Sequence, residues 1–159
     1  MAVEKTAAAE GTVGELRFDP MAMLPFCGYN MADYFAHWLK IGARDKPPKI
    51  FYVNWFRKDR DGNYLWPGFG DNARVLAWIF RRCDGAAEAT ETPIGLVPAK
   101  GAIDMSGLDD VDVDALLKVD EDEVRAGLEQ VREHLARFGD RLPDEIRNQL
   151  KALEGRLAA

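Results

Sequence analysis

The sequence contains few of the residue types that build metal centres and activated nucleophiles. Among its 159 residues there are only two cysteines and two histidines. Cys27 and Cys83 lie far apart, which predicts neither a disulfide framework nor a zinc site. We expect both to be buried thiols in a reducing, cytoplasmic environment. His37 and His134 fall on separate predicted helices without ligand spacing, so the sequence predicts no metal ligand and no catalytic residue in this chain.

Other absences narrow the range of partners. No apolar run approaches the roughly 20 residues of a membrane span, and Met1–Lys5 has no feature of a signal peptide. No G-x-x-x-x-G-K-[ST] string is present to hold a triphosphate. Within the net charge of −6, residues 40–82 carry ten Lys or Arg against four Asp or Glu, whereas residues 104–123 carry nine acids against Lys118. The basic middle can attract an anionic ligand, and the acidic stretch argues against nucleic acid as a partner.

Four stretches have the periodicity of amphipathic helices. The first two are predicted at about 30–41 and 71–82, the second with Asp71 as its N-cap. Later, Asp120 with Glu123 forms a capping pair before one helix and Pro143 opens another, and we expect these two helices to form an antiparallel hairpin. The predicted buried stripe of the helix at 71–82 consists of Val75, Leu76, Ile79 and Phe80.

Strand character is confined to short stretches between these helices. Ile50–Phe56 is apolar, β-branched and aromatic, which predicts a strand covered on both faces. After a turn, Tyr64–Trp66 is expected to return as a short strand, while the two prolines of Thr92–Pro98 allow at most a short edge strand. The pattern predicts a mixed α/β fold with a strand, a loop and a helix in succession.

Aromatic side chains are concentrated in this strand and loop. Flat rings on loops can clamp a flat base, and stacking contributes about 1–3 kcal/mol per base. Aromatic clusters are more often core than ligand sites, so the grouping alone leaves both interpretations open. The five rings are those of Trp55, Phe56, Tyr64, Trp66 and Phe69.

A glycine-rich loop and an amide complete this candidate site. Gly68 and Gly70 let the backbone approach a ligand, and the Asn72 amide can pair with a purine edge. An acceptor fixed at Asn72 would favour guanine, whose N1–H and N2–H are donors. Gly68–Ala73 also fits G-x-G-x-x-A, but Pro67 interrupts the strand that a Rossmann dinucleotide site requires.

Several strings, in matching order, closely resemble the GTP-dependent phosphoenolpyruvate carboxykinases. The resemblance spans nearly the whole chain and is clearest from Thr6 to Gly95. The matching strings are residues 19–23 (DPMAM), 25–30 (PFCGYN), 34–39 (YFAHWL), 51–58 (FYVNWFRK), 65–72 (LWPGFGDN) and 92–95 (TPIG).

The resemblance implies a guanine-nucleotide site for GTP or GDP. In that family the base lies between two rings, here Phe56 and Phe69, and a third ring lines the pocket at Tyr64. The string from Phe69 to Asn72, which includes Gly70 and Asp71, carries guanine contacts, with Asn72 reading the base edge. Two departures are Tyr64, where phenylalanine is common, and Asp71, where glutamate is common. Neighbouring candidates are Trp55 and Gly68.

The resemblance also implies a division of the chain, taken as a single partial domain over residues 1–159. Residues 1–18 are lid-like, residues 19–108 bind the guanine base, and residues 109–159 are C-terminal helices. The lid itself, which closes over bound substrates, corresponds to Thr6, Ala7, Ala8, Ala9 and Glu10.

The family enzyme is about four times longer than this chain and converts oxaloacetate and GTP to phosphoenolpyruvate, GDP and CO2. Its phosphate loop, its Mn²⁺ ligands (Mg²⁺ also serves the whole enzyme) and its substrate-binding residues lie upstream of the lid and have no counterpart here. We therefore expect a C-terminal portion that is inactive alone and whose partner is the missing N-terminal portion. The alternative is a stand-alone guanine-nucleotide-binding or interaction module without catalysis. An in-frame phosphate loop encoded upstream of Met1 would favour the first hypothesis.

Overall fold

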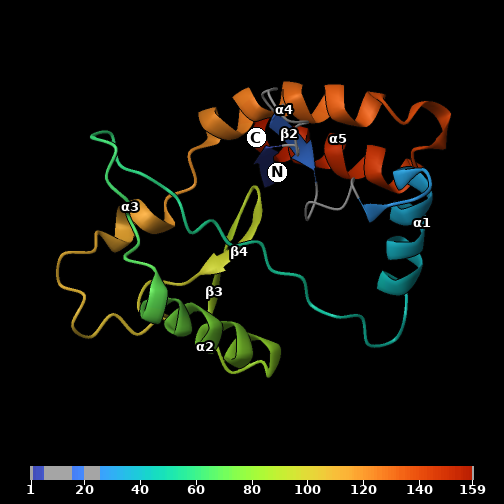
Figure 1. Cartoon of the computed structure of the whole chain (residues 1–159). Coiled ribbons are helices and arrows are strands. Elements are labelled where there is room, and N and C mark those ends of the chain that lie inside the picture. Colours follow the sequence, from blue (N-terminus) through green and yellow to red (C-terminus); the bar gives the residue numbers. More distant parts are fainter. Residues whose placement is uncertain (1, 6–15, 20–25, 159) are drawn as a thin grey trace. The chain divides into compact units, whose positions relative to one another are not determined.

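The described part of the chain, residues 2–5, 16–19 and 26–158 of a computed structural model, consists of helices and two small antiparallel sheets (Figure 1). This mixture agrees with the α/β expectation at that coarse level. The chain divides into two compact units, one of residues 1–47 and 124–155 and the other of residues 48–123 and 156–159. None of the helices in the described ranges is long and apolar enough to cross a membrane.

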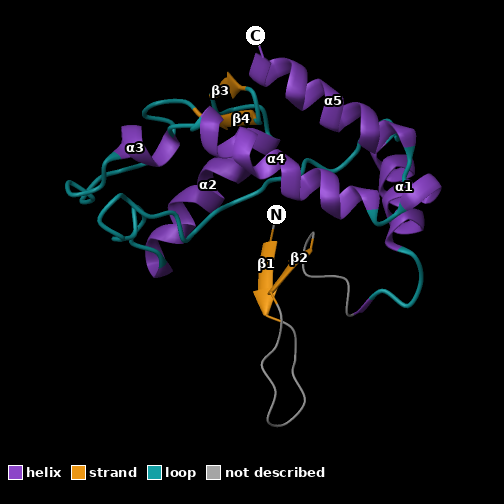
Figure 2. Cartoon of the chain, turned by 90° about the horizontal axis from the view of Figure 1, so that it is seen from above, coloured by secondary structure: helices purple, strands orange, loops and turns teal. Residues whose placement is uncertain are grey.

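The first unit contains most of the N-terminal and C-terminal elements. Strand β1 (Ala2–Lys5) pairs antiparallel with β2 (Leu16–Asp19). Helix α1 (Met31–Gly42) follows, and α4 (Glu121–Ala136) and α5 (Asp144–Ala158) are joined through a short 3₁₀ turn at 139–141 (Figure 2).

Helix α1 begins where the sequence predicts it, because Asn30 accepts a hydrogen bond from the Ala32 backbone N–H at 2.9 Å. Its buried face carries Met31 and Phe35, which pack with Leu142 in the core of the first unit. The Phe35 ring meets the Phe138 ring edge-on at 5.4 Å between centroids. The amphipathic helix predicted at about 30–41 is therefore confirmed.

The predicted cap of α4 is also confirmed. Asp120 accepts hydrogen bonds from the backbone N–H groups of Asp122 and Glu123 at 3.1 and 3.2 Å. These bonds lower the pKa of the Asp120 carboxyl, since they favour its ionised form. Asp120 thus satisfies two of the free N–H groups at the start of this helix.

The second unit holds α2 (Asn72–Cys83), the hairpin of β3 (Ala89–Thr92) and β4 (Gly95–Pro98), and α3 (Val113–Leu117). The short edge strand predicted at 92–98 is formed as β4, and its partner β3 lies mostly before that stretch. Pro93 and Ile94 form the two-residue connection, so Pro93 does not need to donate a ladder hydrogen bond. Both strands are short and pair only with each other among the described residues.

The predicted strand at Ile50–Phe56 is not formed, and residues 50–54 follow an irregular path without strand pairing in the described part of the chain. The alternation is still visible, since Phe51, Val53 and Trp55 are partly buried while the residues between them are exposed. A strand needs a neighbour for its hydrogen bonds, and no described segment lies in pairing register with this one. The return strand at Tyr64–Trp66 is reduced to a single bridge between Lys58 and Tyr64.

The buried face of α2 is centred on Trp78, which was not predicted, while Val75 and Ile79 of the predicted stripe are partly buried. Trp78 is the buried side chain, and its ring packs edge-on against Phe51 at 6.0 Å. Leu76 and Phe80 of the predicted stripe are exposed instead. The large indole ring of Trp78 has more apolar surface to bury than the neighbouring aliphatic side chains. The helix therefore faces the interior with Trp78 at the centre of its buried side.

The two thiols also differ from expectation. Cys83 is exposed at the end of α2, and Cys27 is only partly buried, with its thiol donating to the Tyr29 carbonyl at 3.3 Å. The end of α2 is completed by Lys49, whose ammonium donates to the Arg82 and Cys83 carbonyls at 2.8 and 3.0 Å.

Candidate functional site

A tight turn brings two of the predicted rings together. One carboxylate oxygen of Asp59 accepts from the backbone N–H groups of Asp61 and Asn63 at 2.9 and 2.8 Å. The hydrogen bonds from Asn63 are the main reason that the pKa of Asp59 is lowered. The turn returns the chain to the bridge between Lys58 and Tyr64, and a further bond joins the Leu65 N–H to the Arg57 carbonyl at 2.9 Å.

Phe56 and Tyr64 consequently form a ring pair on the surface. Their centroids lie 6.3 Å apart at 63°, and the side chains are 74% and 60% exposed. The Lys58 ammonium lies 4.7 Å from the centroid of the Tyr64 ring, a cation–π distance. The pair therefore offers aromatic faces and a positive charge to solvent, which is a combination suited to an anionic aromatic ligand.

Phe69 is held in an unusual conformation at the start of α2. It has φ of +49°, in the left-handed region that side chains other than glycine rarely adopt, and its ring is 94% exposed. Gly68 before it has φ of +80°, where glycine carries little strain. Gly70 needs no such conformation, and a Cβ at either glycine would meet open space.

A 3₁₀ turn at Phe69–Asp71 leads directly into α2 and connects Phe69 to Asn72. The Asn72 backbone N–H donates to the carbonyls of Gly70 and Phe69. Phe69 makes no ring contact with another aromatic side chain in the described ranges. The structure thus pairs Phe56 with Tyr64 and joins Phe69 to Asn72 through one turn of backbone.

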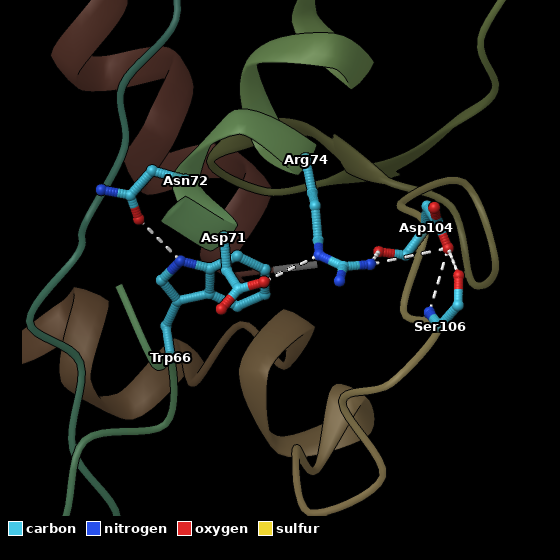
Figure 3. Close-up of polar contacts among 6 residues, drawn as sticks. All are labelled: Trp66, Asp71, Asn72, Arg74, Asp104 and Ser106. Atoms are coloured by element: carbon cyan, nitrogen blue, oxygen red, sulfur yellow. Dashed lines mark hydrogen bonds and ion pairs between the residues drawn. The ribbon is translucent and has the colours of Figure 1, made fainter. Parts of the chain in front are cut away.

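The Asn72 amide is engaged by Trp66, one of the five rings of the aromatic group. Its Oδ1 accepts a hydrogen bond of 2.8 Å from the indole nitrogen of Trp66 (Figure 3). Trp66 is only 4% exposed. Trp66 belongs to the aromatic group seen in the sequence, but nothing in the spacing of Trp66 and Asn72 shows that the two side chains meet.

Asp71 occupies the N-cap position of α2, as predicted, but its side chain does not cap the helix. Its side chain makes no capping hydrogen bond, and it instead accepts from the Arg74 guanidinium at 2.9 Å. Arg74 also donates to the Asp104 carbonyl at 2.9 Å, which links the start of α2 to the loop at 104–106 (Figure 3). A charged hydrogen-bond partner within one helical turn therefore takes the place of the capping bond.

The Asp104 carboxylate organises that loop. It accepts hydrogen bonds from the backbone N–H and the hydroxyl of Ser106. These bonds, with the nearby charges of Arg74 and Arg81, lower the pKa of Asp104. Arg74 was not singled out in the sequence, because the loop that it holds is thirty residues away along the chain.

The remaining predicted site residues are placed as follows. Trp55 is partly buried beside Phe56, while Thr6, Ala7, Ala8, Ala9 and Glu10 lie outside the described residues. Within the described ranges, no three His, Cys, Asp or Glu side chains gather as a metal site would require. The side chains in that part of the chain therefore do not fit a Mn²⁺ centre.

Comparison with known proteins gives consistent matches over nearly the full chain. The family described as "Phosphoenolpyruvate carboxykinase C-terminal P-loop domain" matches residues 1–156. A protein of Neocallimastix frontalis named "Phosphoenolpyruvate carboxykinase [GTP]" is 53% identical over 165 residues, which cover 100% of this chain and 27% of that protein.

Bacterial and archaeal proteins of the same name match similarly. The one from Treponema pallidum is 53% identical over 161 residues (97% of this chain, 26% of its own length), and that from Thermoplasma volcanium is 46% identical over 160 residues (99% and 27%). The chain thus spans about a quarter of the length of these relatives.

Proposed function

The chain belongs to the family of GTP-dependent phosphoenolpyruvate carboxykinases, and we propose that it supplies the guanine-base pocket of such an enzyme. The proposed reaction of the whole enzyme converts oxaloacetate and GTP to phosphoenolpyruvate, GDP and CO2, as part of gluconeogenesis in the cytoplasm. The proposed pocket consists of Trp55, Phe56, Tyr64 and residues 68–72.

The observation that carries this proposal is the conformation of Phe69. A bulky aromatic residue with positive φ and a ring 94% in solvent forgoes burial and bears backbone strain of about 1–2 kcal/mol. Neither feature helps this chain to fold. Both are explained if the ring is held outward for a base to stack on, because stacking contributes about 1–3 kcal/mol per base.

The pair of Phe56 and Tyr64 supplies the second aromatic surface in this proposal. Phe56 precedes the turn at 59–63 and Tyr64 follows it, and both rings are exposed. Lys58 beside Tyr64 adds a positive charge that favours a phosphorylated ligand over a free base. Recognition of the base is therefore the proposed contribution of this chain, and phosphoryl transfer depends on groups that it lacks.

The proposed partner is the remainder of the same enzyme. Ile50, Tyr52 and Phe56 lie on the outer side of the extended segment and are exposed. An exposed apolar segment with period-two alternation is suited to pair with a strand supplied by another part of the protein. The known relatives are about four times as long as this chain, so they contain further segments that are candidates for this strand.

The segments predicted from the sequence remain part of the proposal. Residues 19–108 would bind the base, and residues 109–159 would form the C-terminal helices with α4 and α5 as a hairpin. The ion pair of Arg132 on α4 with Glu154 on α5, at 2.7 Å, supports the hairpin. The assignment of residues 1–18 as lid-like falls mainly outside the described residues and stays a prediction.

Calorimetric or fluorescence titration with GDP and ADP tests the base pocket. We expect weak binding that prefers GDP and that is lost in Phe69→Ala. Phe80→Ala is the matched control, since it removes a ring 71% exposed on the same unit without touching the proposed pocket. Equal binding of GDP and ADP by the unaltered chain, or equal loss in both variants, would overturn the proposal.

A further inference from the structure

The hydrogen bond between Trp66 and Asn72 fixes which end of the amide is free. An indole N–H is a donor only, so its partner at 2.8 Å must be the Oδ1 oxygen and not the NH2 group. Rotating the amide by 180° would place two donors against each other and leave the N–H of Trp66, a side chain only 4% exposed, without a partner. Trp66 therefore holds the amide in one orientation.

The nitrogen of the same amide is left available as a donor. In Figure 3 it points away from the indole. Its two N–H groups have no acceptor among the described residues, and Asn72 is only partly buried. A partly exposed amide whose oxygen is taken and whose nitrogen is free presents hydrogen-bond donors to a ligand.

We propose that Trp66 is a positioning residue for base selection: it orients Asn72 so that Nδ2 donates to the 6-oxo group of guanine. This inference rests on the guanine pocket proposed above and assigns a different hydrogen-bonding role to Asn72. The sequence favoured Asn72 as an acceptor for the N1–H and N2–H donors of guanine, whereas the bond from Trp66 occupies that oxygen and leaves the NH2 group to donate to O6.

Discrimination against adenine follows from the same geometry. Adenine carries an amino donor where guanine carries O6, so the Asn72 NH2 would face another donor. A site whose polar group is left unpaired by the wrong ligand rejects that ligand more strongly than a loose apolar site does. Without the indole bond, the amide could rotate and present its oxygen to adenine, and discrimination would fall.

The test compares two conservative substitutions in the 159-residue chain. Trp66→Phe removes the indole donor that binds Asn72. Trp78→Phe is the matched control, because Trp78 is also 4% exposed and its indole donates at 3.2 Å to a backbone carbonyl, that of Glu88. Both variants lose one buried N–H and a similar volume, and only the first loses contact with Asn72.

We expect the ratio of GDP to ADP affinity to fall about 3- to 10-fold in Trp66→Phe and to stay unchanged in Trp78→Phe. An unchanged ratio in Trp66→Phe would overturn the positioning role while leaving the guanine pocket in place. Equal affinity of the unaltered chain for GDP and ADP would instead overturn the pocket itself, and this inference with it.

A measurement on the unaltered chain keeps the inference testable if Trp66→Phe does not fold. In ¹⁵N-labelled protein, the Asn72 side-chain NH2 resonances should move on addition of GDP and stay in place with ADP. The Trp66 indole N–H resonance should keep its hydrogen-bonded position in both titrations. A Trp66 signal that shifts to that of a solvent-exposed indole when GDP binds, or unmoved Asn72 signals, would contradict the inference.

Discussion

Replacement of Phe69 by glycine should relieve backbone strain in the second unit while weakening base binding. The left-handed conformation of this residue, φ +49°, costs a side chain with a Cβ about 1–2 kcal/mol, and glycine is free of that cost. Glycine loses about 0.5–1 kcal/mol more backbone entropy on folding. Since the ring is 94% exposed, its removal forfeits almost no burial.

The difference leaves Phe69→Gly about 0.5–1 kcal/mol more stable than Phe69→Ala, which keeps the Cβ and the strain. With a typical urea dependence of about 1–3 kcal/mol per molar, the urea midpoint should rise by about 0.2–1 M. Both variants should lose the stacking contribution of about 1–3 kcal/mol, a decrease of about 5- to 150-fold in GDP affinity.

The assay is urea unfolding followed by tryptophan fluorescence in a Trp38→Phe background. The three remaining tryptophans, at positions 55, 66 and 78, all lie in residues 48–123 and report on the second unit. A lower midpoint for Phe69→Gly than for Phe69→Ala would refute the argument from backbone strain. Retention of GDP affinity in both variants would refute the argument from stacking.

Three further predictions concern the core, the pH dependence and the reaction. Leu142→Ala should cost about 2–5 kcal/mol in unfolding of the first unit because Leu142 is buried in its core, whereas the exposed Leu96→Ala should change stability by no more than about 0.5 kcal/mol; urea unfolding monitored by circular dichroism checks both. The pKa of Asp120 is lower folded than unfolded, so its stabilisation is complete above the unfolded value near 3.9 and is lost as the pH falls through the folded value. The helix content of Asp120→Ala should therefore decrease less steeply with falling pH than that of the unaltered chain. The same dependence of helix content on pH in both proteins would contradict the capping role. The chain alone should form no phosphoenolpyruvate from oxaloacetate, GTP and Mn²⁺, and measurable formation in a coupled assay would show that phosphoryl transfer needs fewer groups than we propose.

Helix α1 and the start of α4 could be read from the sequence because the interactions that define them are local. Asn30 and Asp120 each bond to N–H groups within three residues, and the apolar face of α1 repeats with the period of the helix. Such patterns need no knowledge of distant residues. The family strings are local in the same sense, since each is contiguous in the chain.

The buried face of α2 could not be read in this way. The aliphatic residues and Trp78 fit similar periodicities, and the choice between them depends on Phe51, which lies 27 residues earlier. The Asp71 carboxylate had two local options, a capping bond at the start of α2 or an ion pair with Arg74. Arg74 is also bound by the Asp104 carbonyl, which lies thirty residues further along the chain. In each case the outcome was decided by a contact that the spacing does not encode.

The sequence by itself therefore determined the family, the helices with local caps and the identity of the residues proposed to meet the base. Only the tertiary structure decided that Ile50–Phe56 has no strand partner in the described part of the chain. It also decided that Phe69 is exposed with a positive φ and that the Trp66 indole donates to the amide oxygen of Asn72. The physical reason is that a helix closes its hydrogen bonds within its own segment, whereas strand pairing and side-chain orientation depend on which donor and acceptor arrive from elsewhere.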